Sequence, residues 1–136
     1  MKKLFISLIL AYLSFTINTN AANQNTNENN LENEKFLKIG VLLPLSGEFQ
    51  DIGESFLRAI QLALYEISNE NIKIYPKDSK ANSLDAFKAA KDFEELGVEI
   101  VIGPIFHGSL EKLNEINNIT FISLTNKTNG IPKNTI

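Results

Sequence analysis

Four short apolar runs alternate with amphipathic segments, and this alternation limits the folds open to the chain. Short apolar runs bounded by turn residues are typical of strands buried in a parallel sheet. Strands that alternate with helical segments indicate βαβ units, so we predict an α/β protein with a doubly wound parallel sheet. The predicted strands are 36–45, 71–75, 98–102 and 120–124.

Three segments between these runs carry helical patterns. In 53–68, apolar residues recur at helical spacing with charged residues between them, which predicts an amphipathic helix. A second helix is predicted over 84–96, with Ser83 as its N-cap and Gly97 at the C-cap position. A third, shorter helix is predicted over 109–116.

The strand order follows from how apolar each run is. The runs 39–43 and 98–102 are almost continuously apolar and suit interior strands, whereas 71–75 alternates with polar residues and suits an edge. We therefore predict the order 2-1-3-4, with the first strand central. The outer edge of 120–124 is expected to lack a partner, and doubly wound lobes usually have five or six strands. On this basis the chain is expected to be part of a longer protein.

The N-terminus reads as a targeting segment followed by a spacer. Lys2 and Lys3 precede a mostly apolar run too short to span a membrane comfortably, and small residues follow it. We predict a signal peptide over 1–21, with an uncleaved anchor as the alternative. Residues 22–35 are rich in asparagine and are expected to form a disordered spacer, although this composition is also explained by compositional bias.

Composition excludes several classes of function. The chain has no cysteine, which excludes disulfides, thiolate catalysis, cysteine metal sites and a lipid-modified cysteine. We therefore expect a soluble, exported periplasmic protein. Removal of Lys2 and Lys3 with the signal peptide leaves 11 basic against 16 acidic residues, a net charge of −5. Without a basic patch, nucleic acid is a poor candidate partner.

The candidate ligand site is formed by the loops that follow three of the predicted strands. Ligands of open parallel sheets bind beyond the carboxyl ends of the strands, and N–H groups at helix starts there favour an anion such as a carboxylate. The alternative is that Ser46 and Ser109 only cap turns or helices. The predicted site residues are Ser46, Gly47, Phe106, His107, Gly108, Ser109, Thr125 and Asn126.

No set of catalytic residues is apparent, so we expect neither an enzyme nor a metal or cofactor site. His107 is the single histidine, and a lone loop histidine is more often solvated or capping than a base or a metal ligand. Asp78, Asp85 and Asp92 are spaced at seven residues, but the first lies outside the predicted helix 84–96. These three carboxylates are expected to be solvated.

The sequence resembles a known family in two long stretches. KIGVLLPLSGEFQDIGESFLRAIQLALYEI and IYPKDSKANSLDAFKAAKDFEELGVEIVIGP are similar to the opening of type I periplasmic binding proteins, the leucine-binding-protein class. Such proteins have two lobes that close on a small ligand about a hinge. The resemblance implies that 36–136 is the first part of an N-terminal lobe. Gly108 and Lys127 stand where amino-acid binders of the family have a key serine and threonine.

The resemblance leaves two functions open. One is a receptor for a small molecule, an amino acid or another carboxylate, linked to a membrane permease of the ABC type. The alternative comes from LLPLSG (42–47), GPIF (103–106) and ISLTN (122–126), which look more like the penicillin-binding-protein activators. In that branch the same fold regulates peptidoglycan synthesis, and the partner is a cell-wall synthase.

Overall fold

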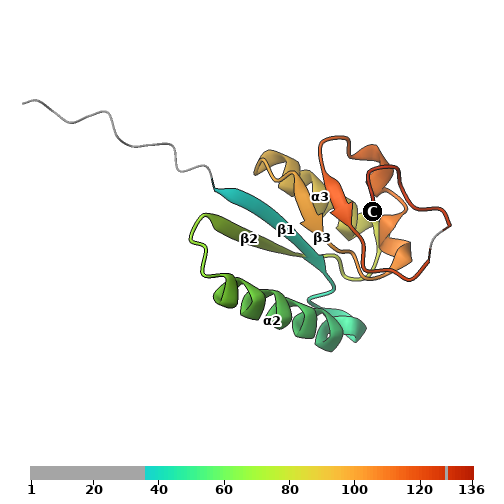
Figure 1. Cartoon of the computed structure of the whole chain (residues 1–136). Helices are drawn as coiled ribbons and strands as arrows, with labels where there is room; N and C mark the ends of the chain where they lie inside the picture. Colours follow the sequence, from blue (N-terminus) through green and yellow to red (C-terminus); the bar gives the residue numbers. More distant parts are fainter. Residues whose placement is uncertain (1–35, 128) are drawn as a thin grey trace, which may run out of the picture. The chain divides into compact units, whose positions relative to one another are not determined.

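The computed structural model describes residues 36–127 and 129–136, where four parallel strands form one sheet in the order β2-β1-β3-β4 (Figure 1). The predicted fold class and strand order are therefore confirmed. The predicted signal peptide and spacer lie outside the described residues. The strands are β1 (Leu37–Leu43), β2 (Ile72–Asp78), β3 (Ile100–Ile102) and β4 (Thr120–Ile122).

Strand β1 is central because it pairs with β2 on one side and β3 on the other. Gly40 lies opposite Tyr75 in β2 and opposite Val101 in β3. A Cβ added at Gly40 would lie 2.8 Å from the Val101 side chain, so glycine makes room for packing at this position. Pro76 has no N–H to donate, which suits the position of β2 at the edge.

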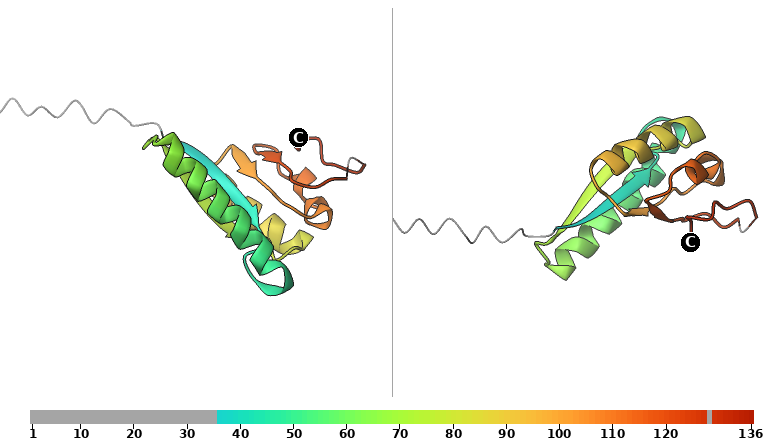
Figure 2. Two further views of the ribbon diagram at one scale, coloured as in Figure 1. Left: turned by 60° about the horizontal axis from the view of Figure 1, so that its bottom comes forward. Right: turned by 90° about the horizontal axis from the view of Figure 1, so that it is seen from above.

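Two helices lie on opposite faces of the sheet. Helix α2 (Gln50–Ile67) connects β1 to β2, and α3 (Ser83–Glu95) connects β2 to β3. Seen from above, the sheet lies between them (Figure 2). This is the arrangement that right-handed crossovers produce when the chain winds in both directions from a central strand. No helix within 36–127 and 129–136 is long and apolar enough to cross a membrane.

The start of α3 differs from the prediction by one residue. Asn82, rather than Ser83, is the N-cap, and its side-chain oxygen accepts hydrogen bonds from the N–H groups of Leu84 (3.1 Å) and Asp85 (2.9 Å). Asparagine and serine are both strong N-caps, so their order in the sequence could not decide between them. Gly97 follows the helix with φ +68°, as expected for a C-terminal glycine.

The helix predicted over 109–116 is wrong. The structure has two 3₁₀ turns instead, η2 (His107–Leu110) and η3 (Leu113–Glu115), separated by Glu111 and Lys112. Such short turns are common connectors. Leu110, Leu113 and Ile116 in this segment are buried in the core. Their spacing of three residues is also compatible with a helix, which explains the incorrect prediction.

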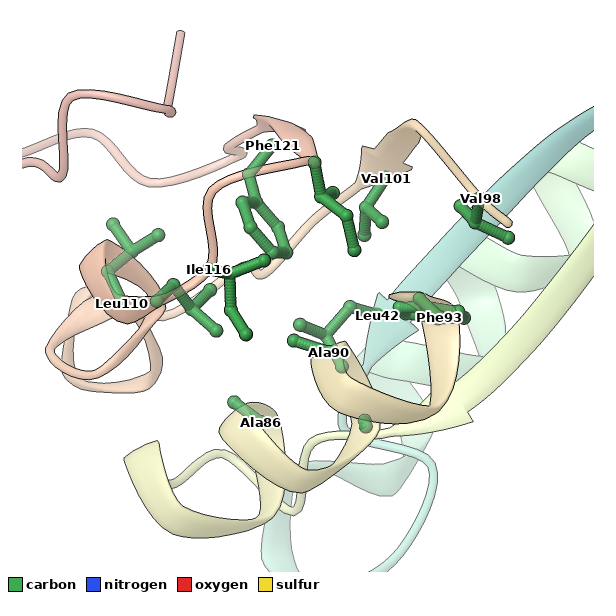
Figure 3. Packing of buried hydrophobic residues seen from close by; sticks show 12 residues of the cluster. Leu42, Ala86, Ala90, Phe93, Val98, Val101, Leu110, Ile116 and Phe121 are labelled. Carbon is green, nitrogen blue, oxygen red and sulfur yellow. The ribbon is translucent and has the colours of Figure 1, made fainter. Parts of the chain in front are cut away.

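The hydrophobic core lies on the face of the sheet that α3 covers. Figure 3 shows Phe93 of α3 and Phe121 of β4, both fully buried, among smaller apolar side chains. The core cluster consists of Leu42, Ala86, Ala89, Ala90, Phe93, Val98, Val101, Leu110, Leu113, Ile116, Ile119 and Phe121. On the opposite side, α2 buries one residue, Gly53.

The edge of β4 is not open, contrary to prediction. The Phe121 N–H donates to Asn134 O (2.8 Å), and Phe121 O accepts from the Ile136 N–H (2.9 Å). The Ser123 N–H donates to Ile136 O (2.9 Å). Residues 134–136 therefore run parallel to β4 and form hydrogen bonds with the backbone groups at its outer edge. The polar sequence of this segment did not reveal this pairing.

Candidate functional site

The loops after β3 and β4 meet at the carboxyl edge of the sheet. The Gly103 N–H donates to Ile122 O (2.8 Å), and the Leu124 N–H donates to Pro104 O (3.0 Å). A Cβ at Gly103 would lie 2.1 Å from Leu42 O, and its φ is +107°, so this close approach requires glycine. Backbone contacts thus fix the two loops against each other and against the end of β1.

A hollow of about 520 Å³ lies between these two loops. Five of the predicted site residues line it, which are Phe106, His107 and Gly108 from the first loop and Thr125 and Asn126 from the second. The remaining lining residues are Ile105, Leu124 and Lys127.

The other three predicted residues lie elsewhere. Ser109 is fully buried beneath the loop, where its hydroxyl has no partner. Ser46 and Gly47 belong to the loop after β1 and do not line the hollow. Gly47 is exposed with φ +78°, which favours glycine because L side chains rarely adopt that conformation.

Among the described residues that line the hollow there is a cation and no carboxylate. Lys127 is exposed at its rim, and the backbone N–H of Lys127 donates to the Thr125 hydroxyl (3.3 Å). His107 also lines the hollow, and its Nδ1 is buried without a hydrogen-bond partner. This arrangement favours an anionic group over a cationic one.

Asp78 holds the β1 loop, a role that the sequence did not reveal, and the expectation that it is solvated is wrong. It ends β2 opposite Leu43 and is partly buried. Its carboxylate accepts hydrogen bonds from the Leu45 N–H (2.8 Å), the Ser46 hydroxyl (2.5 Å) and the Lys80 N–H (2.8 Å). Asp85 and Asp92 instead form ion pairs with lysines at the surface.

These contacts determine the protonation of Asp78. Burial raises the pKa of its carboxyl group, but hydrogen bonds from Ser46, Lys80 and Leu45 and the charge of Lys80 outweigh burial. The net result is a pKa below the ordinary value of 3.8. The carboxylate is therefore ionised at neutral pH, and it uses the donors of the β1 loop that were expected to meet an anionic ligand.

The β1 loop reaches the hollow through an aromatic pair. The ring centroids of Phe49 and Phe106 lie 4.6 Å apart, with an interplanar angle of 50°. Phe106 lines the hollow and Phe49 packs behind it. The alternation of strands and helices does not reveal such a contact, because Phe49 lies in a 3₁₀ turn, η1 (Gly47–Phe49).

Two other features of the described residues bear on the site. A second hollow, of about 630 Å³, lies between 111–117 and 130–134, and none of the predicted site residues lines it. The described residues hold no group of three or more histidine, cysteine, aspartate or glutamate side chains placed to bind a metal ion. The described residues that line the hollow between the loops after β3 and β4 offer hydrogen-bonding groups, a lysine and an aromatic wall.

Solved structures with a similar fold are binding proteins and a regulator. The leucine binding protein LivK from Thermotoga maritima is 21% identical, with a TM-score of 0.61 over 67% of this chain and 28% of its own. A solute binding protein of an ABC transporter from R. palustris, in complex with 4-hydroxybenzoate, is 17% identical, with a TM-score of 0.65 over 74% and 30%.

The C-domain of LpoA from Haemophilus influenzae, described as a regulator of PBP1A, also has a fold similar to that of this chain. It is 23% identical, with a TM-score of 0.53 over 63% of this chain and 27% of its own. At such identities the likeness concerns the fold alone. The chain spans less than a third of each of these proteins, and no curated protein matches its sequence significantly.

A family model gives the assignment that these structures leave open. The model described as LppC putative lipoprotein matches residues 20–134, which include every strand and helix described above. The chain therefore belongs to the LppC putative lipoprotein family.

Proposed function

We propose that this protein acts in the bacterial envelope as a regulator of a cell-wall synthase, which it binds through the carboxyl edge of its sheet. The observation that carries the proposal is the family match over 20–134, together with the likeness to LpoA, a regulator of PBP1A. The segments LLPLSG, GPIF and ISLTN, which resemble penicillin-binding-protein activators, all lie at this edge.

The chemistry of the edge supports a protein partner. Asp78 takes the Leu45 N–H and the Ser46 hydroxyl, so these donors are not free to bind a small anion. The exposed residues at the rim of the hollow are Gly108, Leu124, Asn126 and Lys127. An open rim of this kind leaves room for a side chain of a partner to enter.

A second function, a receptor for a small anionic molecule, is favoured by the hollow itself. It has an apolar wall at Phe106, a cation at Lys127 and no carboxylate in its lining. The R. palustris relatives are described in complex with benzoate and with 4-hydroxybenzoate, which combine an apolar ring and a carboxylate. In this protein the same two groups would meet Phe106 and Lys127.

We also propose where the protein works and how it acts. The protein works after export, in the periplasm or at a membrane facing it. It acts by binding and not as an enzyme, since the related structures are described as binding proteins and a regulator. None of the 136 residues is a cysteine, although the family is described as a lipoprotein family.

Binding measurements separate the two functions. The bifunctional penicillin-binding protein of the same organism is immobilised and titrated with the exported protein in its full length. We expect a dissociation constant in the micromolar range or below and a changed rate of glycan-strand synthesis. In parallel, thermal unfolding is measured with leucine, benzoate and 4-hydroxybenzoate. A ligand that raises the midpoint, combined with no binding to the synthase, would support the receptor function instead.

A charge variant locates the binding surface. Lys127→Glu reverses the charge at the hollow and is expected to weaken binding of the synthase at least tenfold. Lys88→Glu makes the same change on the exposed surface of α3, outside the hollow, and is the matched control. Equal effects of the two variants would contradict binding at the carboxyl edge.

A further inference from the structure

We propose that Asp78 is a positioning residue of the candidate site. Through the loop 45–49 it holds the Phe49 ring against Phe106, and so it sets the aromatic wall of the hollow. Asp78 touches neither Phe106 nor the other lining residues in any hydrogen bond of the described structure. Its effect on binding rests on the proposed function, whereas its effect on the two rings does not.

Asp78 attaches the loop 45–49 to the end of β2. One carboxylate oxygen of Asp78 accepts from the Leu45 N–H and the Lys80 N–H, and the other accepts from the Ser46 hydroxyl. The loop after β1 is thus tied to the turn after β2 by one side chain. Hydrogen bonds to an ionised acceptor are stronger than those between neutral groups.

The chain just before this loop is also held against α2. Gly53 lies so close to Pro44 that an added Cβ would be 1.9 Å from the Pro44 carbonyl oxygen. The short turn η1 follows at once, and the Gln50 N–H closes it on Gly47 O. Between these two attachments, the chain has little freedom before it reaches Phe49.

The rings of Phe49 and Phe106 are in contact. Phe49 and Phe106 pack at a centroid distance of 4.6 Å in a tilted arrangement, a geometry that aromatic pairs favour. No residue of 45–49 lines the hollow, so the β1 loop acts on it through Phe106. Displacement of the loop would remove the support behind one wall.

The carboxylate of Asp78 is suited to this role because both of its oxygens accept. An asparagine at this position would keep one oxygen for the Leu45 N–H and would have to donate its NH₂ group to the Ser46 hydroxyl, so the hydrogen bonds would lose the assistance of the charge. Asp78→Asn is therefore expected to weaken the attachment of the loop, and Asp78→Ala to remove it. The two substitutions therefore weaken the attachment of the loop to different degrees, and Asp78→Asn does so with little change in the size of the side chain.

Fluorine NMR of the full chain labelled with fluorophenylalanine tests the positioning. Each resonance is assigned with single Phe→Leu variants. Asp78→Ala is expected to shift the resonances of Phe49 and Phe106 and to leave those of Phe93 and Phe121, in the core, in place. The control is Asp92→Ala, an exposed residue that pairs with Lys77. Unchanged Phe49 and Phe106 resonances, or equal shifts of all four, would overturn the proposal.

A double-mutant cycle tests the effect on the site. Binding to the synthase is measured for Asp78→Ala, Phe106→Ala and the double variant. If Asp78 acts through Phe106, Asp78→Ala weakens binding about tenfold alone and has no further effect in the Phe106→Ala background. Additive losses would refute action through Phe106. If the unaltered protein does not bind, the proposed function fails, and the fluorine spectra still decide the positioning role.

Discussion

Gly53 of α2 packs directly against Pro44 at the end of β1. An added Cβ would lie 1.9 Å from the carbonyl oxygen of Pro44 and 2.7 Å from its carbonyl carbon, both of them backbone atoms. Backbone cannot rotate away as a side chain would. The absence of a side chain at Gly53 is therefore what allows α2 to approach the sheet, and Gly53 is also the residue that this helix buries.

Gly53→Ala is expected to destabilise the protein. A methyl group at this contact pushes α2 away from β1, and overpacking of this kind costs about 3 kcal/mol. Urea denaturation of the exported full chain measures the free energy of unfolding. Gly108→Ala is the control, because a Cβ there meets nothing within 4 Å. A loss for Gly53→Ala no larger than that for Gly108→Ala would show that α2 moves without cost.

Removal of the Asp78 charge is expected to change how stability depends on pH. Its pKa in the folded protein lies below the ordinary 3.8, so the ionised carboxylate stabilises the fold above about pH 4. That stabilisation is lost as the pH falls through the folded pKa. We expect the difference in stability between the protein and Asp78→Asn to be constant near neutral pH and to shrink below about pH 4.

Ser46→Ala is the companion variant for this measurement. The hydrogen bond from Ser46 is the largest of the contributions that lower the pKa of Asp78. Its removal should reduce the shift and give a weaker dependence on pH than in the unaltered protein. The measurement is urea denaturation between pH 3 and pH 7. A difference between the protein and Asp78→Asn that does not change over this range would contradict the assignment.

Asn134→Ala is expected to loosen the turns beside the hydrophobic core. The Asn134 side-chain NH₂ donates to Leu113 O (2.9 Å) and Ile116 O (2.7 Å), so the substitution leaves two carbonyl groups without these donors. The expected loss is about 2 kcal/mol. Asn126→Ala changes an exposed asparagine and should stay within about 0.5 kcal/mol of the unaltered protein. Thermal unfolding of both variants provides the comparison, and similar midpoints would argue against the role of Asn134.

Phe93→Ala is expected to be the most destabilising of these substitutions. Phe93 is fully buried under Gly40 and in the core cluster, and removal of such a ring costs about 3–5 kcal/mol. Phe56→Ala removes the same ring from α2, where its side chain is 39% exposed, and should cost less than half as much. Denaturant titration of both variants tests this difference, which would be absent if the two faces of the sheet were equally packed.

The strands and their order were predictable because each depends on a pattern of apolar residues. Gly40 through Leu43 is buried on both faces of the sheet, and a continuous apolar run is the signature of that environment. The 3₁₀ turns over 107–115 were not predictable in the same way. Leu110, Leu113 and Ile116 are buried, and they recur at intervals of three that fit a helix as well as two short turns.

The candidate site was partly predictable for a different reason. Phe106, His107 and Thr125 lie in the loops that follow β3 and β4, and the carboxyl ends of parallel strands meet at one edge, so their proximity follows from topology. Asp78 also ends a strand, but its role depends on where the β1 loop turns. That direction is set by the contact between Gly53 and Pro44, which joins residues without any shared sequence pattern.

The uneven burial on the two faces of the sheet has a consequence for how the molecule opens. Helix α3 contributes four buried residues to the core, whereas α2 contributes Gly53 alone. Detachment of α2 therefore exposes little surface that is buried in the native state. The amide hydrogens of α2 should exchange with solvent through a local opening of low free energy. The amides of α3 should exchange only when the whole domain unfolds. The described part of the chain then has two cooperative units, and α2 is the one released first.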